Sequence, residues 1–114
     1  MRHIVQSKVF ADIMKSGGKV RGKVASLHYR RKNEQKGLAV GITISKKNVR
    51  KAVRRNYIRR LVYLYFQHAE IAGQKAVEIV VRVGPENATW KKRTISKTIR
   101  EELEHLSKKA GIIL

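Results

Sequence analysis

The sequence contains no cysteine and only one proline among its 114 residues. Without cysteine, the chain can form neither a disulfide nor a thiolate metal site, which is typical of a reducing compartment. No apolar run approaches the roughly 20 residues that a membrane-spanning helix needs, and residues 1–12 lack the apolar core of a signal peptide. We therefore expect an intracellular, cytoplasmic protein with no membrane association.

Acidic residues are also scarce, because 8 Asp and Glu stand against 27 Lys and Arg, for a formal net charge of +19. A polyanion such as a nucleic acid is the partner that would offset this charge. Hydrophobic residues make up 42% of the chain, so we expect one folded domain spanning residues 1–114. None of the four histidines has a carboxylate or a second histidine at the spacing of metal ligands: His3, His28, His68 and His105. No pair of carboxylates is placed for general acid–base catalysis. Catalysis by the protein alone is therefore not expected.

The positive charge is concentrated in residues 46–60, where eight of fifteen residues are Lys or Arg. No acid occurs between Glu34 and Glu70, so the segment lacks the i, i+4 ion pairs that support a solvated charged helix. Asn56 is a poor helix former in the middle of this run, which favours a directed hydrogen-bonding role. This pattern predicts a nucleic-acid-binding surface in preference to a merely solvated face.

Hydrophobic periodicity predicts an α+β protein of order α-β-β-(β)-α-β-α, with a small, mainly antiparallel sheet packed with helices. Helices are expected at residues 6–15, from the basic segment to about 68, and from 89 to about 109. Ser7 and Thr89 are the expected N-caps, and Gly111 is the expected stop. Strands are expected at residues 20–31, 38–45 and 76–83, with a polar turn at 32–37 joining the first two as a hairpin and another turn at 84–87. If the last two strands are parallel neighbours, their crossover should be right-handed.

Helical spacing assigns faces to the expected helices. The core face of the basic helix should carry Val53, Tyr57, Leu61, Leu64 and Tyr65. Its opposite arc should carry Arg55, Asn56, Arg59, Arg60 and Tyr63. The last helix has an apolar stripe formed by Ile95, Ile99, Leu103 and Leu106. Phe10 and Met14 lie one turn apart, and the sequence leaves open whether they are core or part of a base-stacking cleft. A sheet with stackable side chains beside a basic helix favours single-stranded or structured RNA over duplex DNA.

Two segments carry a family resemblance: Ile44-Ser45-Lys46-Lys47 and the run Ala-Val-Arg-Arg-Asn-Tyr-Ile-Arg-Arg-Leu at residues 52–61. Together they resemble the protein subunit of bacterial ribonuclease P, in which a strand ending in Ser-Lys-Lys precedes a helix with an Arg-Asn-Arg signature. The first helix with its glycine stop, the strand at 77–82 and Thr89-Trp90 also match. The chain departs from the family pattern at several places. Tyr57 and Tyr63 stand at positions that are commonly basic in the family, and Met14 and residues 48–51 also differ from the pattern.

The resemblance implies the ribonuclease P protein fold, similar to ribosomal protein S5 domain 2, with a left-handed β-α-β crossover. It implies a protein cofactor, bound one to one to an RNA subunit that holds the active site and its magnesium ions. This holoenzyme removes the 5′ leader of precursor tRNA by phosphodiester hydrolysis that leaves a 5′-phosphate. The catalytic RNA would contact Lys46, Lys47, Arg50, Lys51, Arg54, Arg55, Asn56, Arg59 and Arg60. The leader would lie in a cleft lined by Phe10, Met14, His28, Tyr29, Thr43 and Ser45. No cofactor or metal bound firmly by the protein is expected.

Three alternatives stay open at this point. A ribosomal or other structural RNA-binding protein would share the composition but have no leader-binding role, and it would co-purify with ribosomes. A DNA-binding regulator would dimerise and prefer duplex DNA. A stand-alone nuclease would cleave RNA with no RNA subunit present.

Overall fold

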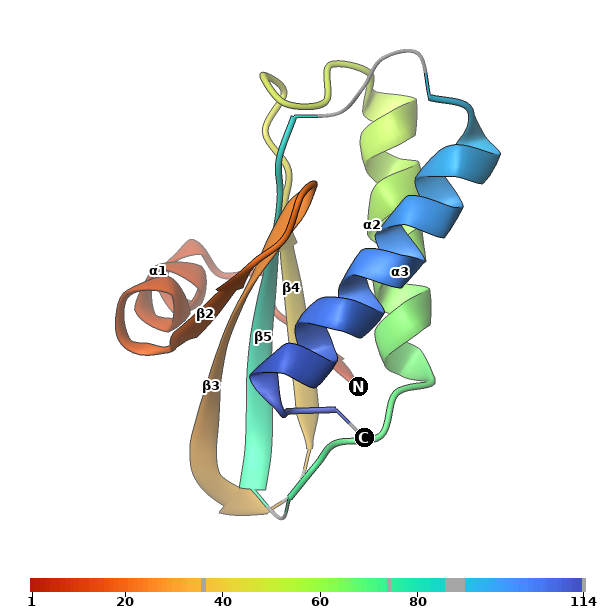
Figure 1. The fold of residues 1–114 in the computed structure, drawn as a ribbon. Coiled ribbons are helices and arrows are strands. Elements are labelled where there is room, and N and C mark those ends of the chain that lie inside the picture. The colour runs from red at the N-terminus through yellow and green to blue at the C-terminus, as the bar shows by residue number, and fades with distance from the viewer. Residues whose placement is uncertain (36, 74, 86–89, 114) are drawn as a thin grey trace.

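The computed structural model of the protein describes residues 1–35, 37–73, 75–85 and 90–113. Along the chain the elements are β1 (Arg2–His3), α1 (Ser7–Ser16), β2 (Gly18–Arg21), β3 (Ala25–Gln35), β4 (Leu38–Thr43), α2 (Ala52–Gln67), β5 (Lys75–Val83) and α3 (Lys92–Ala110). Helix α1 covers one face of the sheet, and α2 and α3 cover the other (Figure 1). The predicted α+β architecture is confirmed, with the short strand β1 added at the beginning.

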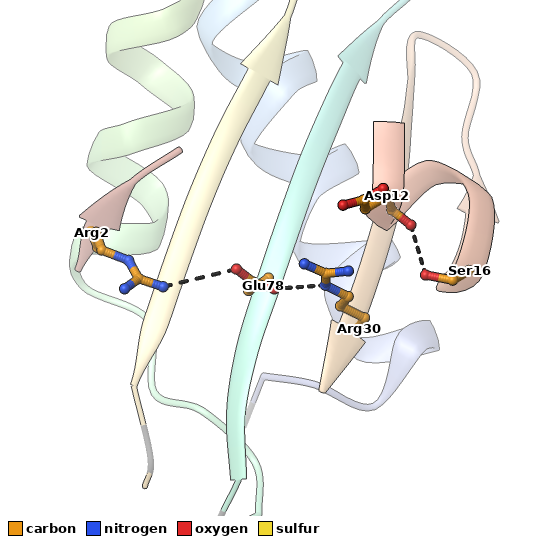
Figure 2. A network of polar contacts seen from close by, with 5 residues as sticks. All are labelled: Arg2, Asp12, Ser16, Arg30 and Glu78. Atoms are coloured by element: carbon orange, nitrogen blue, oxygen red, sulfur yellow. Dashed lines mark hydrogen bonds and ion pairs between the residues drawn. The ribbon is translucent and has the colours of Figure 1, made fainter. Parts of the chain in front are cut away.

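The sheet has the order β1-β4-β5-β3-β2, so the last strand of the sequence lies in its middle. Strand β3 pairs antiparallel with β2 and β5, whereas β4 pairs parallel with β5 and β1. Figure 2 shows the sheet from the α1 side, with β4 and β5 pointing upward and β5 to the right of β4; helix α2 lies on the far side of the sheet (Figure 1). The β4-α2-β5 crossover is therefore left-handed, an exception to the usual right-handed rule.

Three strand predictions need correction. Residues 20–31 form two strands, because β2 and β3 are separated by a turn in which the Gly22 N–H donates to the Ala25 carbonyl (2.8 Å). Most of the predicted turn at 32–37 belongs to β3, which continues to Gln35. The predicted hairpin between β3 and β4 is wrong, because β5 lies between them and pairs with both. Apolar alternation shows that a segment is extended, but it does not show which strand is its neighbour.

The helix limits agree with the prediction more closely than the caps do. Helix α1 begins at Ser7 with Gln6 at the N-cap position, so Ser7 is not the cap. Helix α3 begins at Lys92 with Lys91 at the N-cap position, and the predicted cap Thr89 lies outside the described residues, as do residues 86 and 87 of the predicted turn. Gly111 ends α3 as predicted, in the left-handed conformation with φ of 70° that glycine adopts at low cost.

The main core lies between the sheet and the helices α2 and α3. The predicted stripe of α3 is buried there, as are the sheet residues Leu27, Val40 and Ile79. Helix α2, by contrast, buries Ile58, Val62 and Phe66, while Val53 is 71% exposed and Leu64 is 52% exposed. The predicted core arc of α2 is therefore displaced. A second, smaller cluster under α1 contains Ile4, Ile13, Ala39 and Val80.

Candidate nucleic-acid interface

The loop between β4 and α2, residues 44–51, presents a group of cations to solvent. Ser45 shapes this basic loop, because its Oγ accepts from the Asn48 N–H (3.1 Å) and its carbonyl accepts from the Val49 N–H (3.0 Å). Val49 is fully buried and anchors the loop in the main core. The anchored loop leaves four cationic side chains exposed: Lys46, Lys47, Arg50 and Lys51. Ser45 thus helps to shape the basic loop.

Helix α2 continues this cationic surface. Asn56 and Arg60 are exposed, and the partly exposed Arg59 donates from Nη1 to the Asn56 Oδ1 (3.2 Å). Within the described residues, no carboxylate pairs with Arg59, Arg60 or the exposed cations of the basic loop. We call the four loop cations together with Asn56, Arg59 and Arg60 the basic surface. Its charge is balanced by nothing in the described part of the chain, so it is available to a polyanion.

Two predicted RNA-contacting arginines have partners inside the protein. Arg55 donates from Nη1 to the carbonyls of Val49 (2.9 Å) and Arg50 (2.7 Å), and so closes the basic loop onto the first turn of α2. Arg54 donates from Nη2 to the Trp90 carbonyl (3.1 Å), which ties α2 to the segment before α3. Both side chains are half-buried. Their first role is therefore to position the basic surface.

The tyrosines at commonly basic family positions pack within the fold. Tyr57 donates from its hydroxyl to the Lys92 carbonyl (3.3 Å), and the Lys92 ammonium lies 5.5 Å from the Tyr57 ring centroid. Tyr63 stacks on His3 with ring centroids 3.9 Å apart, which joins α2 to β1. The two tyrosines thus join α2 to the start of α3 and to β1.

Phe10 and Met14 are both half-buried and pack on the cluster under α1. The Phe10 ring lies against Gly41 of β4, where any side chain larger than hydrogen would overlap it. Each residue therefore contributes to packing and still exposes part of its surface on the α1 side. Such partly exposed apolar groups are suited to stacking with a base.

The α1 face of the sheet includes His28 but not Tyr29. Successive strand residues point to opposite faces, and Tyr29 packs on the main core with α2 and α3. Thr43 shares the α1 face with Gly41, and the register aligns Thr43 with Arg82. Of the six predicted leader-binding residues, the fold brings four together on this face: Phe10, Met14, His28 and Thr43. Tyr29 and Ser45 have other surroundings.

His28 is buried, with 3% of its surface exposed, and its Nε2 lies 3.2 Å from the Ser26 Oγ. Its Nδ1 has no hydrogen-bond partner in the described structure. Burial, followed by the nearby charges of Lys19, Arg82 and Arg21, lowers the pKa of His28 below its usual value. The imidazole is therefore neutral at pH 7.

Two polar groups on the α1 face escaped the sequence reasoning. The first is the set of cations Lys19, Arg21 and Arg82, which reach one region from β2 and β5. The second is buried Glu78, whose Oε1 accepts from the Arg30 Nε (2.6 Å) while its Oε2 lies 3.8 Å from the Arg2 Nη2 (Figure 2). The available signal was their alternation, at odd-numbered positions of β2 and even-numbered positions of β3 and β5, but it needed the correct strand limits.

Among residues 1–35, 37–73, 75–85 and 90–113, no group of three or more His, Asp or Glu side chains could hold a metal ion. Within the same ranges, no helix has the length and apolar character needed to cross a bilayer.

The fold and the site define a class: a small basic α+β protein with a left-handed crossover and a cation-rich loop and helix. The Ribonuclease P family model matches residues 1–111. The ribonuclease P protein component of Halalkalibacterium halodurans is 30% identical over 112 residues, covering 96% of this chain and 88% of that protein. The chain belongs to the ribonuclease P protein family, and the resemblance seen in the sequence is confirmed.

Solved structures show the same fold. The Staphylococcus aureus RNase P protein has a TM-score of 0.79 at 24% identity and covers 100% of this chain and 99% of its own. The RNase P protein of Thermotoga maritima has a TM-score of 0.72 at 24% identity, covering 96% and 97%. The left-handed crossover and the five-stranded sheet are thus features of a family fold.

Proposed function

We propose that this chain is the protein cofactor of ribonuclease P, which binds the catalytic RNA and the 5′ leader of precursor tRNA. In this proposal the basic surface contacts the catalytic RNA, and the α1 face contacts the single-stranded leader. The observation that carries the proposal is the presence of two unlike surfaces, a cationic one formed by the loop after β4 and by α2, and a partly apolar one on the α1 face of the sheet.

The basic surface supports the first contact. Lys51 and Arg60 are exposed, and within the described residues neither side chain has a hydrogen-bond or ion-pair partner. Lysine and arginine groups in this state can neutralise phosphates and release condensed counterions, which is the main source of affinity for a folded RNA. Arg54 and Arg55 support the same contact indirectly, because they hold the loop and helix in place.

The α1 face supports the second contact. Phe10 and Met14 offer partly exposed apolar surface, the half-buried Thr43 lies on the same face of the sheet, and the neutral His28 is buried there. Single-stranded RNA is commonly held by stacking on such side chains with cations along its backbone. Tyr29 and Ser45 are not part of this contact.

The proposed division of labour follows from charge. Two RNA molecules repel one another, and a +19 protein between them offsets that repulsion and favours magnesium binding nearby on the RNA. Water would attack one phosphodiester of precursor tRNA at the active site of the RNA subunit, leaving a 5′-phosphate on the tRNA and a 3′-hydroxyl on the leader. The protein would position the substrate and supply no catalytic group.

Reconstitution with a bacterial ribonuclease P RNA subunit and a precursor tRNA tests this proposal. We expect the protein to stimulate cleavage at low magnesium concentration. Arg60→Gln should weaken binding of the RNA subunit about threefold or more, since it removes one phosphate contact. Phe10→Ala should weaken binding of precursor tRNA but leave binding of mature tRNA unchanged.

Arg100→Gln is the matched control, because Arg100 is an exposed arginine of α3 outside both surfaces. It should behave as the unmodified protein in each assay. The assignment is wrong if Phe10→Ala weakens only the RNA subunit, or if the protein leaves precursor cleavage unchanged at every magnesium concentration.

A further inference from the structure

A surface pocket of ≈270 Å³ lies at the end of the β2–β3 hairpin, beside the α1 face. Its described lining contains four cationic side chains, Lys19, Arg21, Lys23 and Arg82, with Ser26 and Asn48 between them. None of the described lining residues is acidic or aromatic. Each of the four cations is exposed, and none forms an ion pair within the described chain.

Strand pairing places two of these cations, Arg21 and Arg82, in one row across the sheet. Arg21 is aligned with Ser26, Ser26 with Arg82, and Arg82 with Thr43, so the row crosses β2, β3, β5 and β4. With strands about 4.8 Å apart, the Cα atoms of Arg21 and Arg82 are about 10 Å apart. The next row along the strands contains Lys19, His28 and Gly41, and the Phe10 ring lies on Gly41. The pocket is thus one row away from the apolar part of the α1 face.

Protection of a sheet edge explains only part of this arrangement. Cations on an edge strand discourage pairing with another chain, and Lys19 and Arg21 lie on the edge strand β2. Arg82 lies on β5, the central strand, where there is no edge to protect. Like charges gathered at one point are unfavourable unless a ligand compensates them. A ligand is therefore the better explanation for Arg82.

The chemistry of the lining selects the ligand. A pocket without aromatic side chains cannot stack a base, whereas guanidinium groups match the oxygens of a phosphate in a bidentate manner. Asn48 donates from Nδ2 to the Val83 carbonyl (3.1 Å), which holds the basic loop against the same pocket. A phosphate backbone could therefore run from Phe10 to the row that contains Arg82 and Arg21.

We propose that this pocket binds backbone phosphates of a single-stranded RNA, with Arg21 and Arg82 contacting phosphate oxygens. The proposal rests on the proposed function, since the RNA is the precursor leader that leaves the α1 face. It adds a direction to that contact: bases stack near the partly exposed Phe10, and the backbone then follows the row from Arg82 to Arg21.

Chemical neutralisation of single phosphates tests this pocket without an RNA subunit. A set of labelled single-stranded RNA oligonucleotides, each with one uncharged methylphosphonate linkage, is titrated with the full chain by fluorescence anisotropy. For the unmodified protein, we expect neutralisation at one or two linkages to weaken binding about three- to tenfold. The Arg82→Gln protein should bind the unmodified RNA more weakly by a similar factor. Neutralising those same linkages should then cause no further loss of affinity for this variant.

The dependence on salt gives a second readout. The slope of log affinity against log salt should decrease by about 0.7 for Arg82→Gln and again for Arg21→Gln, one single-strand phosphate contact each. Arg100→Gln should change neither the slope nor the linkage pattern. Circular dichroism with thermal unfolding confirms that each variant is folded.

The proposal is overturned if every methylphosphonate affects Arg82→Gln as strongly as the unmodified protein. It is also overturned if Arg100→Gln reproduces the changes of Arg82→Gln. These results are separate from a failure of the proposed function. We use linkage coupling for the case in which a methylphosphonate weakens binding of the unmodified protein but not of Arg82→Gln. Linkage coupling without stimulation of precursor cleavage would reject only the ribonuclease P role. Stimulation of cleavage without linkage coupling would reject only this pocket.

Discussion

Arg55 and Arg60 both belong to the most cationic segment of the chain, but they have different roles. The Arg55 guanidinium is occupied by two backbone carbonyls, and Arg60 is exposed on the outer side of α2. A hydrogen bond donated by a charged side chain to the backbone stabilises the folded protein. An exposed cation without a partner contributes little to that stability. A cluster of positive charge in the sequence therefore predicts a cationic surface. It does not predict which arginines of the cluster reach solvent and which bind the backbone.

Arg55→Ala should consequently lower the free energy of unfolding by about 1–3 kcal/mol, because two carbonyls lose their donor. Arg60→Ala should change it by less than about 0.5 kcal/mol. Urea denaturation followed by circular dichroism measures both values. Equal destabilisation by the two variants would contradict the role given to Arg55.

The lowered pKa of His28 predicts a pH dependence of stability. In the unfolded chain, histidine binds a proton below about pH 6.5, whereas folded His28 stays neutral until a lower pH. The unfolded state thus binds more protons in this window, so the free energy of unfolding should fall as the pH drops from about 6.5. One proton limits the slope to about 1.4 kcal/mol per pH unit.

Thermal and urea unfolding at pH values from about 7 to 5.5 would measure this slope, above the range in which most carboxylates titrate. His28→Phe should flatten the dependence. His68→Gln, at an exposed histidine, should preserve it. A His28→Phe protein with an unchanged slope would show that another group is responsible.

At the scale of the elements, α2 shows why a helical wheel can select the wrong face. Its exposed positions include Val53 and Leu64, and its buried ones are Ile58, Val62 and Phe66. Apolar residues therefore occur on several sides of α2, and the arc that is richest in them is not the one that meets the sheet. Three residues of the predicted arc, Tyr57, Leu61 and Tyr65, are half-buried and pack on the main core. The predicted face is therefore rotated from the buried face but overlaps it.

The β2–β3 hairpin depends on a distant residue. Glu102 of α3 accepts from the backbone N–H groups of Lys23, at its Oε1, and of Val24, at 2.7 Å from its Oε2. Because both donors lie in the turn, this carboxylate holds the hairpin against α3. The cations Lys19, Arg21 and Lys23 lie on or next to that turn, so the same contact also positions part of the pocket.

Glu102→Ala should therefore lower the free energy of unfolding by about 1–3 kcal/mol, since two backbone donors lose a charged acceptor. Glu101→Ala is the control, because Glu101 is exposed and its oxygen lies 4.0 Å from the Lys97 ammonium in a surface pair. That variant should lose less than about 0.5 kcal/mol. Hydrogen exchange of the hairpin amides would locate the effect, and unchanged protection in Glu102→Ala would contradict it.

At the scale of the whole molecule, the net charge of +19 has opposite effects on folding and on binding. Self-repulsion destabilises the compact state, and salt screens it over a Debye length of about 10 Å at 0.1 M. Binding to RNA depends on the release of counterions, and salt opposes it.

The isolated protein should therefore gain thermal stability as sodium chloride rises from about 10 to 150 mM, by about 5 °C or about 1 kcal/mol. Over the same range its affinity for RNA should fall steeply. Thermal unfolding and a binding titration at matched salt concentrations check both signs. A flat response of the binding constant would contradict a phosphate-dominated interface.

Much of the architecture could be read from local pattern. The strands near residues 38–45 and 76–83, the end of α2, the α3 stripe and the Gly111 stop are confirmed because each depends on a short stretch of sequence. The hairpin assigned to β3 and β4 is wrong because β5, more than thirty residues further on, lies between them. Of the candidate site, Phe10, Met14, His28 and Thr43 share a face, and Tyr29 does not because strand residues alternate.

The amino-acid sequence alone determined the excess of positive charge, its concentration before and within α2, and the α+β class. These are properties of composition and short-range periodicity. The tertiary structure alone decided which cations reach solvent, and it brought Arg82 beside Arg21. The physical reason is that strand pairing is selected by burial summed over the whole core, which no single segment records.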